Sequence, residues 1–235
     1  MYAVHDGYLV AHIRCSDPRL LEEVGDLADH QNIHKTDMAY SDFNLEKVKQ
    51  TFQINTIEAA DIFANVSDLE CSQLLKEILQ YNVPIAIASN SEKARSEMII
   101  APILIDLRRQ LNDKINLFSG VEFNVDAAQG LNGICDFIIS DSPERLIVTA
   151  PVVVIVEAKK ENIPAGLGQC IAEMLAARIF NERSGKENLA IYGTVTTGSI
   201  WQFLKLDGQE IQIDLSEYYL KDVNKILGIL ANGVR

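Results

Sequence analysis

The sequence predicts an α/β fold: a mixed central sheet flanked by helices, with a helical extension before it. Residues 91–235 follow the order helix, three strands, helix, two strands, helix, which is typical of layered α/β domains. The third strand is a run of five β-branched residues, Val152–Val156, behind Pro151. Such a run is typical of a strand that is buried on both faces. We therefore expect this strand to lie in the interior of the sheet.

Composition describes an ordinary globular chain of 235 residues, long enough for one large or two small domains. The formal net charge of −12 argues against a general nucleic-acid binder that works through a broad basic face. Residues 1–90 contribute −8 and residues 91–235 contribute −4. Carboxylates that ligate a metal ion would account for part of the second value.

The expected location is the cytoplasm, with no membrane association. No apolar stretch reaches the length of a membrane span, and the first residues lack the basic and then apolar pattern of a signal peptide. The four cysteines lie far apart and form no Cys-x-x-Cys pair, so neither a zinc site nor a disulfide framework is expected.

Residues 1–41 form an N-terminal segment whose structure the sequence does not define. Tyr8–Ile13 has the pattern of a strand, and Asp17-Pro18 is typical of a helix start. His30 and His34 have a spacing that suits metal binding on a helix. Their neighbours are polar and resemble a loop, which favours exposed histidines.

The sequence pattern of residues 42–90 predicts a helical subdomain, which we expect to serve packing or partner binding. Thr56–Phe63 has apolar residues at helical spacing. Ser67 and Glu70 fit a capping box that opens a second helix, which continues with an apolar stripe from Leu74 to Leu79. No catalytic constellation is visible in this region.

Residues 91–235 predict the α/β core. A capping signal at Ser91 opens a helix over Lys93–Leu111, which Pro102 is expected to kink or restart. Two strands follow, Ile115–Val125 and Gly133–Ser140, and the connection between them is typical of a hairpin.

Two strands of this core carry charged residues where apolar ones are expected. Asp136 shares one strand face with two isoleucines and needs partners to be stable there. Glu157 and Lys159 follow Val152–Val156 and point to the same side, because side chains alternate along a strand, whereas Ala158 points away. An acid and an amine at the rim of a buried sheet are costly to desolvate. A functional role for Glu157 and Lys159 would explain why they are present despite this cost.

The remainder completes the predicted sheet. Gly166–Asn181 is apolar nearly all round and predicts a buried helix, on which Gln169 and Glu173 share one face. We expect Glu173 to serve packing or helix-pair charge rather than to bind a ligand. The last predicted elements are strands at Leu189–Thr197 and Ser199–Leu206, a short edge strand at Glu210–Leu215 and a closing helix at Glu217–Leu230.

Taken together, these residues resemble the signature of the PD-(D/E)XK nuclease superfamily, which has the restriction-endonuclease-like fold. The resemblance spans roughly Ser91 to Leu206, and the helix, hairpin, strand, helix and strand stand in the family's order. The residues that carry it are Asp136, Glu157, Lys159, Gln169 and Glu97.

The resemblance implies a site for Mg²⁺ or Mn²⁺ at Asp136 and Glu157, often helped by the carbonyl of Ala158. Lys159 would position or activate the attacking water. Glu97 matches an acidic residue on the first core helix of many members, and Gln169 matches a polar residue of some branches. Phosphodiester hydrolysis requires the same residue types, because Mg²⁺ prefers oxygen ligands such as carboxylates and a lysine ammonium stabilises developing negative charge.

Each residue also has a plain structural explanation. Glu157 and Lys159 make sense as an ion pair at the rim of the sheet, Asp136 as the cap of a turn, and Cys135 and Cys170 as small core residues. The presence of all five signature residues in the expected order favours a site.

The sequence therefore predicts Mg²⁺-dependent phosphodiester hydrolysis of nucleic acid, with DNA as the expected substrate. Two alternatives remain: a nuclease-like fold used as a non-catalytic binding or assembly module, and a metal-dependent hydrolase of another phosphorylated substrate. The acidic balance favours the module. A homodimer is expected, with residues 42–90 and the helix Tyr218–Leu230 as candidate interfaces. Nucleic-acid binding predicts that cations gather around the site, namely Lys93, Arg95, Arg108, Arg109, Lys160, Arg178 and Arg183.

Overall fold

The computed structural model describes residues 2–5, 8–11 and 38–234. The chain divides into two compact units, Met1–Lys35 and Thr36–Arg235. In the first unit, β1 (Tyr2–His5) and β2 (Tyr8–Ala11) pair antiparallel. The strand predicted from Tyr8 is thus confirmed as far as Ala11. The predicted helix start at Asp17 and the pair His30 and His34 lie outside the described residues.

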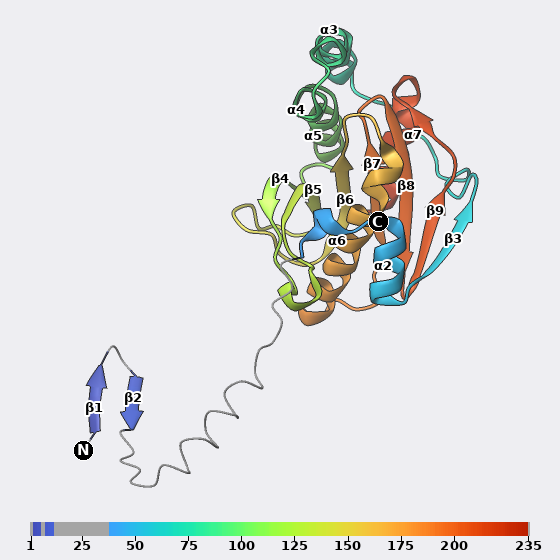
Figure 1. The fold of residues 1–235 in the computed structure, drawn as a ribbon. Helices are drawn as coiled ribbons and strands as arrows, with labels where there is room; N and C mark the ends of the chain where they lie inside the picture. The colour runs from blue at the N-terminus through green and yellow to red at the C-terminus, as the bar shows by residue number, and fades with distance from the viewer. Residues whose placement is uncertain (1, 6–7, 12–37, 235) are drawn as a thin grey trace. The chain divides into compact units, whose positions relative to one another are not determined.

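The second unit is built on a mixed sheet of eight strands, in the order β3-β9-β8-β7-β6-β5-β4, with β10 paired to β8 (Figure 1). Among the described strand pairs, only β3–β9 and β6–β7 are parallel. The α/β class and the mixed sheet are therefore confirmed. The strands are β3 (Asn55–Ala59), β4 (Asn116–Glu122), β5 (Ile134–Ser140), β6 (Val152–Ala158), β7 (Ile191–Thr196), β8 (Ile200–Asp207), β9 (Glu210–Asp214) and β10 (Tyr218–Tyr219).

Helices cover both faces of the sheet, and a separate apolar core fills the space under each set (Figure 1). One core includes residues of α2 and α6, and the other includes residues of α3, α5 and α7. The helical segments are η2 (Tyr40–Asp42), α2 (Leu45–Phe52), α3 (Gln73–Ser89), α4 (Glu92–Arg95), the π-helical turn η3 (Ser96–Ile100), α5 (Ala101–Gln110), η4 (Ala127–Gln129), α6 (Ile163–Arg183), η5 (Leu220–Asp222) and α7 (Val223–Asn232).

Strand β6 lies between β5 and β7, and all seven of its residues are buried. Helix α6 packs directly on β6 and β7. The prediction of a buried interior strand covered by this helix is confirmed. By length and apolar composition, α6 is the one helix among the described residues that would suffice to cross a membrane, but most of that apolar stretch is buried inside the fold. Cys135 and Cys170 are free and buried, as predicted.

The helix predicted from Ser91 forms as α4, η3 and α5 in direct succession. The Ser91 side chain accepts a hydrogen bond from the Ala94 N–H and so caps the first turn. The π-helical turn ends just before Pro102, which lies in the first turn of α5. Proline has no N–H to donate and crowds the preceding turn, so the wider turn accommodates it without ending the helix.

The helix predicted at Thr56–Phe63 is wrong. Residues 55–59 form β3, which pairs in parallel with β9. Because β3 lies outside β9, the prediction that Glu210–Leu215 forms an edge strand is also wrong. Pairing with a strand more than 150 residues away overrides the local helical pattern.

The second helix of this region starts later than its capping box predicted. Helix α3 begins at Gln73, with Ser72 as its N-cap. Asp106 of α5 accepts hydrogen bonds from both the N–H and the hydroxyl of Ser72, and this tertiary contact places the helix start. Residues 45–89 thus add a strand to the main sheet, within the compact unit Thr36–Arg235.

The closing helix α7 begins at Val223, after Tyr218 and Tyr219 have formed β10. The apolar residues of α7 are buried in the core of the same chain, among them Ile226 and Leu230. Among the described residues α7 therefore exposes little apolar surface, and the dimer interface at this helix stays a prediction.

Candidate functional site

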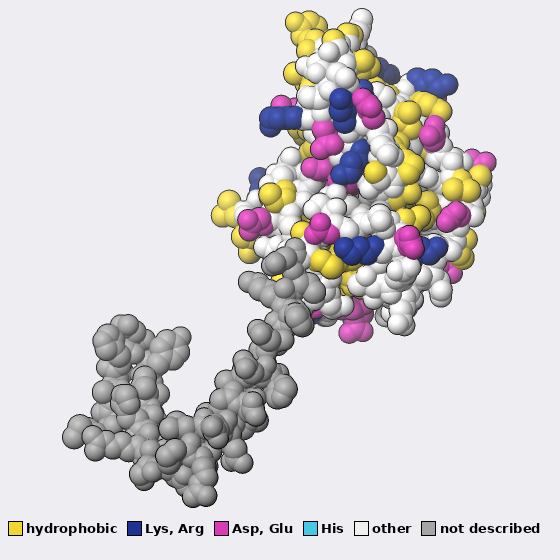
Figure 2. All heavy atoms as spheres, viewed as in Figure 1, with side chains coloured by type: hydrophobic (Ala, Val, Ile, Leu, Met, Phe, Trp, Pro, Cys, Tyr) yellow, Lys and Arg dark blue, Asp and Glu magenta, His cyan; other side chains and the backbone are white. Residues whose placement is uncertain are grey.

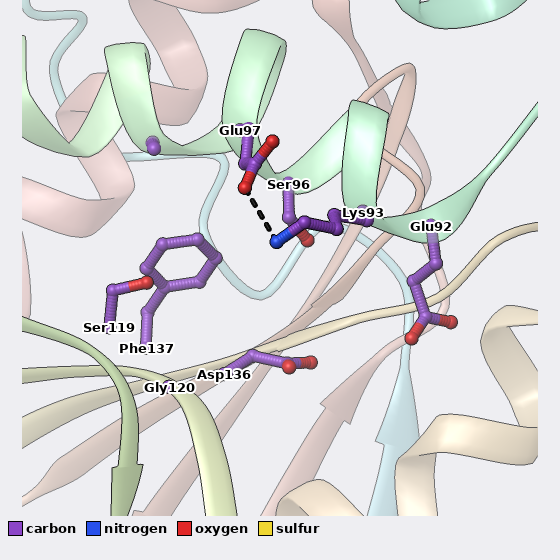
Figure 3. Close-up of a pocket in the computed structure, with 9 residues that line it drawn as sticks. Glu92, Lys93, Ser96, Glu97, Ser119, Gly120, Asp136 and Phe137 are labelled. Atoms are coloured by element: carbon purple, nitrogen blue, oxygen red, sulfur yellow. Dashed lines mark ion pairs between the residues drawn. The ribbon is translucent and has the colours of Figure 1, made fainter. Parts of the chain in front are cut away.

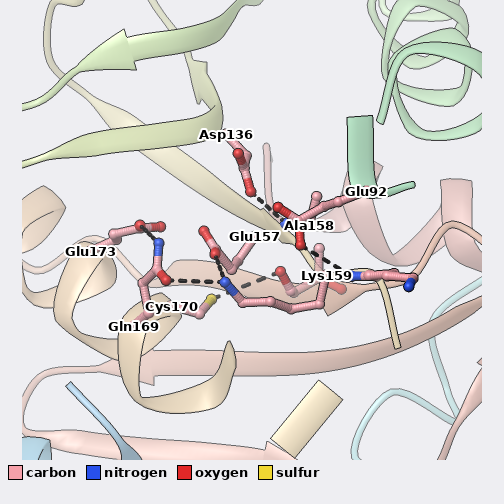
Figure 4. Close-up of polar contacts among 10 residues, drawn as sticks. Glu92, Asp136, Glu157, Ala158, Lys159, Gln169, Cys170 and Glu173 are labelled. Carbon is pink, nitrogen blue, oxygen red and sulfur yellow. Dashed lines mark hydrogen bonds and ion pairs between the residues drawn. The ribbon is translucent and has the colours of Figure 1, made fainter. Parts of the chain in front are cut away.

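The predicted acidic residues meet at one rim of the sheet, where β5 begins and β6 ends. The two strands are antiparallel, and the register that pairs Phe137 with Val156 places Asp136 next to Glu157. The N–H of Ala158 donates to Asp136 Oδ2 at 2.8 Å (Figure 4). Strand pairing thus fixes the two carboxyl groups beside one another.

Lys159 links this acidic pair to α6. Its Nζ lies 2.5 Å from Glu157 Oε1 and donates to Gln169 Oε1 at 3.1 Å (Figure 4). Its backbone N–H donates to the carbonyl of Thr196 in β7, so the chain at Lys159 is still held by the sheet. The structure therefore brings together four of the five predicted site residues.

The cluster extends one step further, to Glu173. The Gln169 Nε2 donates to Glu173 Oε1 at 3.1 Å, which continues the chain of contacts along α6 (Figure 4). Glu157 and Glu173 are both buried, with 1% and 0% of their surface exposed. The Oε2 atoms of both residues are buried and have no hydrogen-bond partner among the described residues. Buried polar atoms are rarely left this way, and each such case calls for an explanation.

Burial makes these carboxyl groups hold protons more tightly than usual. Burial raises the pKa of Glu157 to about 8, with a further contribution from the negative charge of Asp136 and an opposing one from Lys159. Burial also raises the pKa of Asp136, against the hydrogen bond from Ala158. The pKa of Glu173 is raised well above its ordinary value by burial and by the charge of Glu157. Three crowded carboxyl groups share one ammonium group, so a cation at this point would be stabilised.

Lys159 stays charged in this environment. Burial lowers its pKa, but the negative charge and the hydrogen bond of Glu157 more than offset burial, and the pKa is raised overall. Lys159 is therefore a fixed positive hydrogen-bond donor and not a neutral base.

Glu97 lies apart from this cluster, in a pocket of about 260 Å³ between the first core helix and the β4–β5 hairpin (Figure 3). Asp136 lines the same pocket. The carboxylate of Glu97 pairs with Lys93 Nζ at 2.7 Å, and both side chains are more than half exposed. Glu97 thus shares a pocket with Asp136 but is not bonded to the buried cluster.

Sequence reasoning missed Glu92 as a member of the site. Glu92 Oε2 accepts from the backbone N–H of Lys160 at 3.1 Å, and Glu92 lines the pocket with Asp136 (Figures 3 and 4). In the sequence Glu92 is only the residue after Ser91 in the predicted capping signal, which indicates a helix start and no site. Glu173 was assigned to packing, although its spacing from Gln169 was the available signal.

The donor set fits a hard divalent cation. Asp136 and Glu157 supply carboxylate oxygens, and Glu157 Oε2 has no hydrogen-bond donor among the described residues that would compete with a cation. Within the described ranges, no group of three or more His, Cys, Asp or Glu side chains is arranged to hold a metal ion. Mg²⁺ is commonly bound through only one or two carboxylates and keeps several waters, so a two-carboxylate set suits it. The carbonyl of Ala158 would be a third donor.

The cations named as a test of nucleic-acid binding do not gather as a group. Lys93 lines the pocket beside Asp136, and Lys160 directly follows Lys159. Three arginines bond to backbone carbonyls, and of their acceptors Thr197 lies next to Thr196, which accepts from the Lys159 N–H. On the face in Figure 2 basic and acidic side chains are interspersed. Those three contacts are Arg95 to Thr197 O, Arg108 to Ile115 O and Arg183 to Val125 O.

Arg178 likewise bonds to the carbonyl of Gly208, and Arg109 lies at a groove between α3 and α5. The described surface near the site thus offers Lys93, Lys160 and Arg95 rather than a broad basic face. No known family model, curated protein or solved structure matches this chain. The geometry of the site itself therefore carries the functional assignment.

Proposed function

We propose that this protein hydrolyses phosphodiester bonds of nucleic acid, with DNA as the expected substrate and Mg²⁺ or Mn²⁺ as the cofactor. The observation that carries the proposal is the buried Oε2 of Glu157, which has no hydrogen-bond partner in the described part of the chain and lies beside Asp136 and Lys159 at a sheet rim. A buried carboxylate without a hydrogen-bond partner destabilises the folded state, and its negative charge would stabilise a bound cation.

The order of elements supports the same proposal. The helix α4–α5, the β4–β5 hairpin, β6, α6 and β7 follow one another in the order that the PD-(D/E)XK resemblance implies. Strands β4, β5 and β6 are antiparallel neighbours, and β7 is parallel to β6. A restriction-endonuclease-like core is therefore part of the proposal.

Each residue has a distinct task in this reaction. The divalent cation, when bound, polarises the phosphoryl oxygen and lowers the pKa of a bound water. Asp136 and Glu157 supply the negative charge that holds it. Lys159, fixed between Glu157 and Gln169, donates to the attacking water or to the charge that develops on the phosphate.

Lys93 is the cation best placed to meet a phosphate of the substrate. It lines the pocket with Asp136, and its only ion pair among the described residues is with Glu97. Exposed pairs of this kind contribute little, about 0.2–1 kcal/mol, so a phosphate competes easily for the ammonium.

A binding or assembly module with the same fold is the second candidate. The observation that favours it is the position of Arg108, Arg178 and Arg183 away from the site, together with the net charge of −12. A third candidate, the hydrolysis of a small phosphorylated compound, is favoured by the limited size of the pocket beside Asp136.

The experiment that separates the three candidates uses purified protein and four substrates: linear, circular and single-stranded DNA, and a small chromogenic phosphodiester. Each is incubated with Mg²⁺, with Mn²⁺ and with chelator, and the Lys159→Ala variant is the matched control. Cation-dependent cleavage of DNA by the wild type alone supports the proposal. DNA binding without cleavage indicates the module, and cleavage of the small substrate alone indicates the third candidate.

A symmetric dimer is a further part of the proposal, since an enzyme that cuts both strands of a duplex commonly works as a pair of subunits. Helix α3 exposes large apolar side chains, Leu74, Tyr81 and Ile85, and α5 adds Ile105. This surface is a candidate interface in addition to α7. Light scattering at micromolar concentration is expected to give twice the monomer mass, and monomer alone would contradict the dimer.

A further inference from the structure

Helix α6 carries two polar residues in an otherwise apolar stretch that packs on the sheet. Gln169 lies at the rim and is half-buried, whereas Glu173 lies one turn deeper and is fully buried. The two are four residues apart and bond to each other through Gln169 Nε2 and Glu173 Oε1. Among the described residues, the hydrogen bond that joins Glu173 to the predicted site is the one from Gln169.

The amide of Gln169 has two different ends, and both are engaged. Lys159 Nζ can only donate, so it requires the amide oxygen of Gln169. The carboxyl oxygen of Glu173 accepts, so it requires the amide nitrogen. One orientation of the amide satisfies both neighbours, and the opposite orientation satisfies neither.

Stability of the fold does not explain a carboxyl group at position 173. Its second oxygen is buried without a hydrogen-bond partner among the described residues, and a buried polar group in that state is unfavourable. Two neighbours on the helix, Ala172 and Met174, are apolar and fully buried, so an apolar side chain would suit the core at least as well.

We propose that Glu173 is a positioning residue of the hydrolytic site, which fixes the Gln169 amide so that its oxygen holds the ammonium of Lys159. The inference rests on the proposed function for its catalytic consequence. A lysine ammonium has three N–H donors. Glu157 and Gln169 take two of them, which leaves the third aimed in one direction for water or phosphate.

The test compares Glu173→Leu, which removes the acceptor, with Glu173→Gln, which keeps an oxygen that can accept from Gln169. Loss of a residue that orients a ligand or catalytic group typically costs 10–100-fold in activity. We expect Glu173→Leu to lower kcat by about 10–100-fold with KM unchanged, and Glu173→Gln to retain nearly full activity. Glu173→Met is a second apolar variant of similar length, should the leucine fail to fold.

A double-mutant cycle shows whether Glu173 acts through Gln169. In a Gln169→Leu background, Glu173→Leu is expected to have no further effect on kcat, because the residue that it orients is gone. Full additivity of the two changes would overturn the proposal, as would a Glu173→Gln variant as impaired as Glu173→Leu.

An NMR measurement tests the positioning without any activity. The side-chain amide of Gln169, assigned by its loss in Gln169→Leu, is expected to give two resolved and slowly exchanging proton signals in the wild type and in Glu173→Gln. In Glu173→Leu these signals are expected to shift and to exchange faster. Unchanged signals would refute the positioning role. Absence of hydrolysis in the wild type would refute the proposed function, and these signals would still decide the role of Glu173.

Discussion

Two strands of the same sheet end in a buried acid, and the surroundings of the two acids differ. Asp214, the last residue of β9, is fully buried. Its Oδ1 accepts from the N–H groups of Asp61 and Ser216 at 3.0 and 2.9 Å, and its Oδ2 accepts from the Tyr218 hydroxyl at 2.9 Å. Glu157, near the end of β6, has Lys159 on one oxygen and no partner on the other among the described residues.

The difference separates a structural acid from a candidate functional one. Hydrogen bonds to Asp214 replace the water that burial removes, so this carboxylate ties the chain after β9 to the chain after β3. Glu157 is desolvated without that compensation, and Asp136 lies beside it with a charge of the same sign. A buried carboxyl group that lacks hydrogen-bond partners and lies next to a second carboxyl group is typical of a site that binds a cation or a substrate.

The largest expected effects are on turnover. Asp136→Ala is expected to abolish both metal binding and cleavage, because it removes half of the anionic ligand set. Lys159→Ala is expected to keep the metal and to lose turnover by roughly 10²–10³-fold, or about 3–4 kcal/mol, since it removes one preorganised donor. A nuclease assay with a parallel Mn²⁺ titration measures both, and loss of metal in Lys159→Ala would contradict the assigned roles.

The next expected effect is on the stability of the folded protein, when Asp214 is replaced. Asp214→Ala removes the acceptor of the Ser216 N–H and of the Tyr218 hydroxyl, whereas the Asp61 N–H keeps Ser216 Oγ as a second acceptor. A buried unsatisfied group costs about 1–3 kcal/mol. We expect the free energy of unfolding to fall by roughly 3 kcal/mol or more in urea denaturation.

Asp214→Asn is the matched control, because its amide oxygen still accepts from both N–H groups, and it is expected to lose less. Cleavage by the folded fraction of Asp214→Ala is expected to be unchanged. A specific loss of activity in that variant would remove the distinction between the two acids.

A gradual effect is expected on the pH dependence of stability. Glu157 has a pKa of about 8 in the folded protein, against 4.5 as its ordinary value. Between these values the folded state keeps a proton that the unfolded state has lost, so stability falls as pH rises through this window and levels off above it. The contribution is at most about 1.4 kcal/mol per pH unit. Glu157→Gln is expected to flatten the decline, measured by urea denaturation with chelator present, and equal slopes would contradict the raised pKa.

The sequence predicted the elements whose patterns are strong and local. Five β-branched residues behind Pro151 identify β6, and the apolar stretch from Gly166 identifies α6, because each pattern fits only a buried element. Strand β3 was missed, since Glu58 and Ala59 favour a helix and only pairing with β9 makes them a strand.

Within the site too, local patterns could be predicted from the sequence, whereas contacts between distant segments could not. Glu157 and Lys159 were predicted to share a side because alternation along a strand is local. The adjacency of Asp136 to Glu157 depends on strand register, and the contact of Glu92 with Lys160 joins residues 68 positions apart. Burial of the second oxygen of Glu157 is a property of the whole packed core, so no local pattern reveals it.

The most direct test of the central claim is a calorimetric titration of Mn²⁺ into the wild type and into Glu157→Gln, each with and without a non-cleavable DNA duplex. The account predicts saturable binding of the cation to the wild type at up to millimolar concentration, and its loss in Glu157→Gln. It also predicts no loss in Asp214→Asn, which changes the structural acid instead. If the wild type binds no divalent cation at millimolar concentration even with DNA present, the hydrolytic proposal is contradicted and the binding module takes its place.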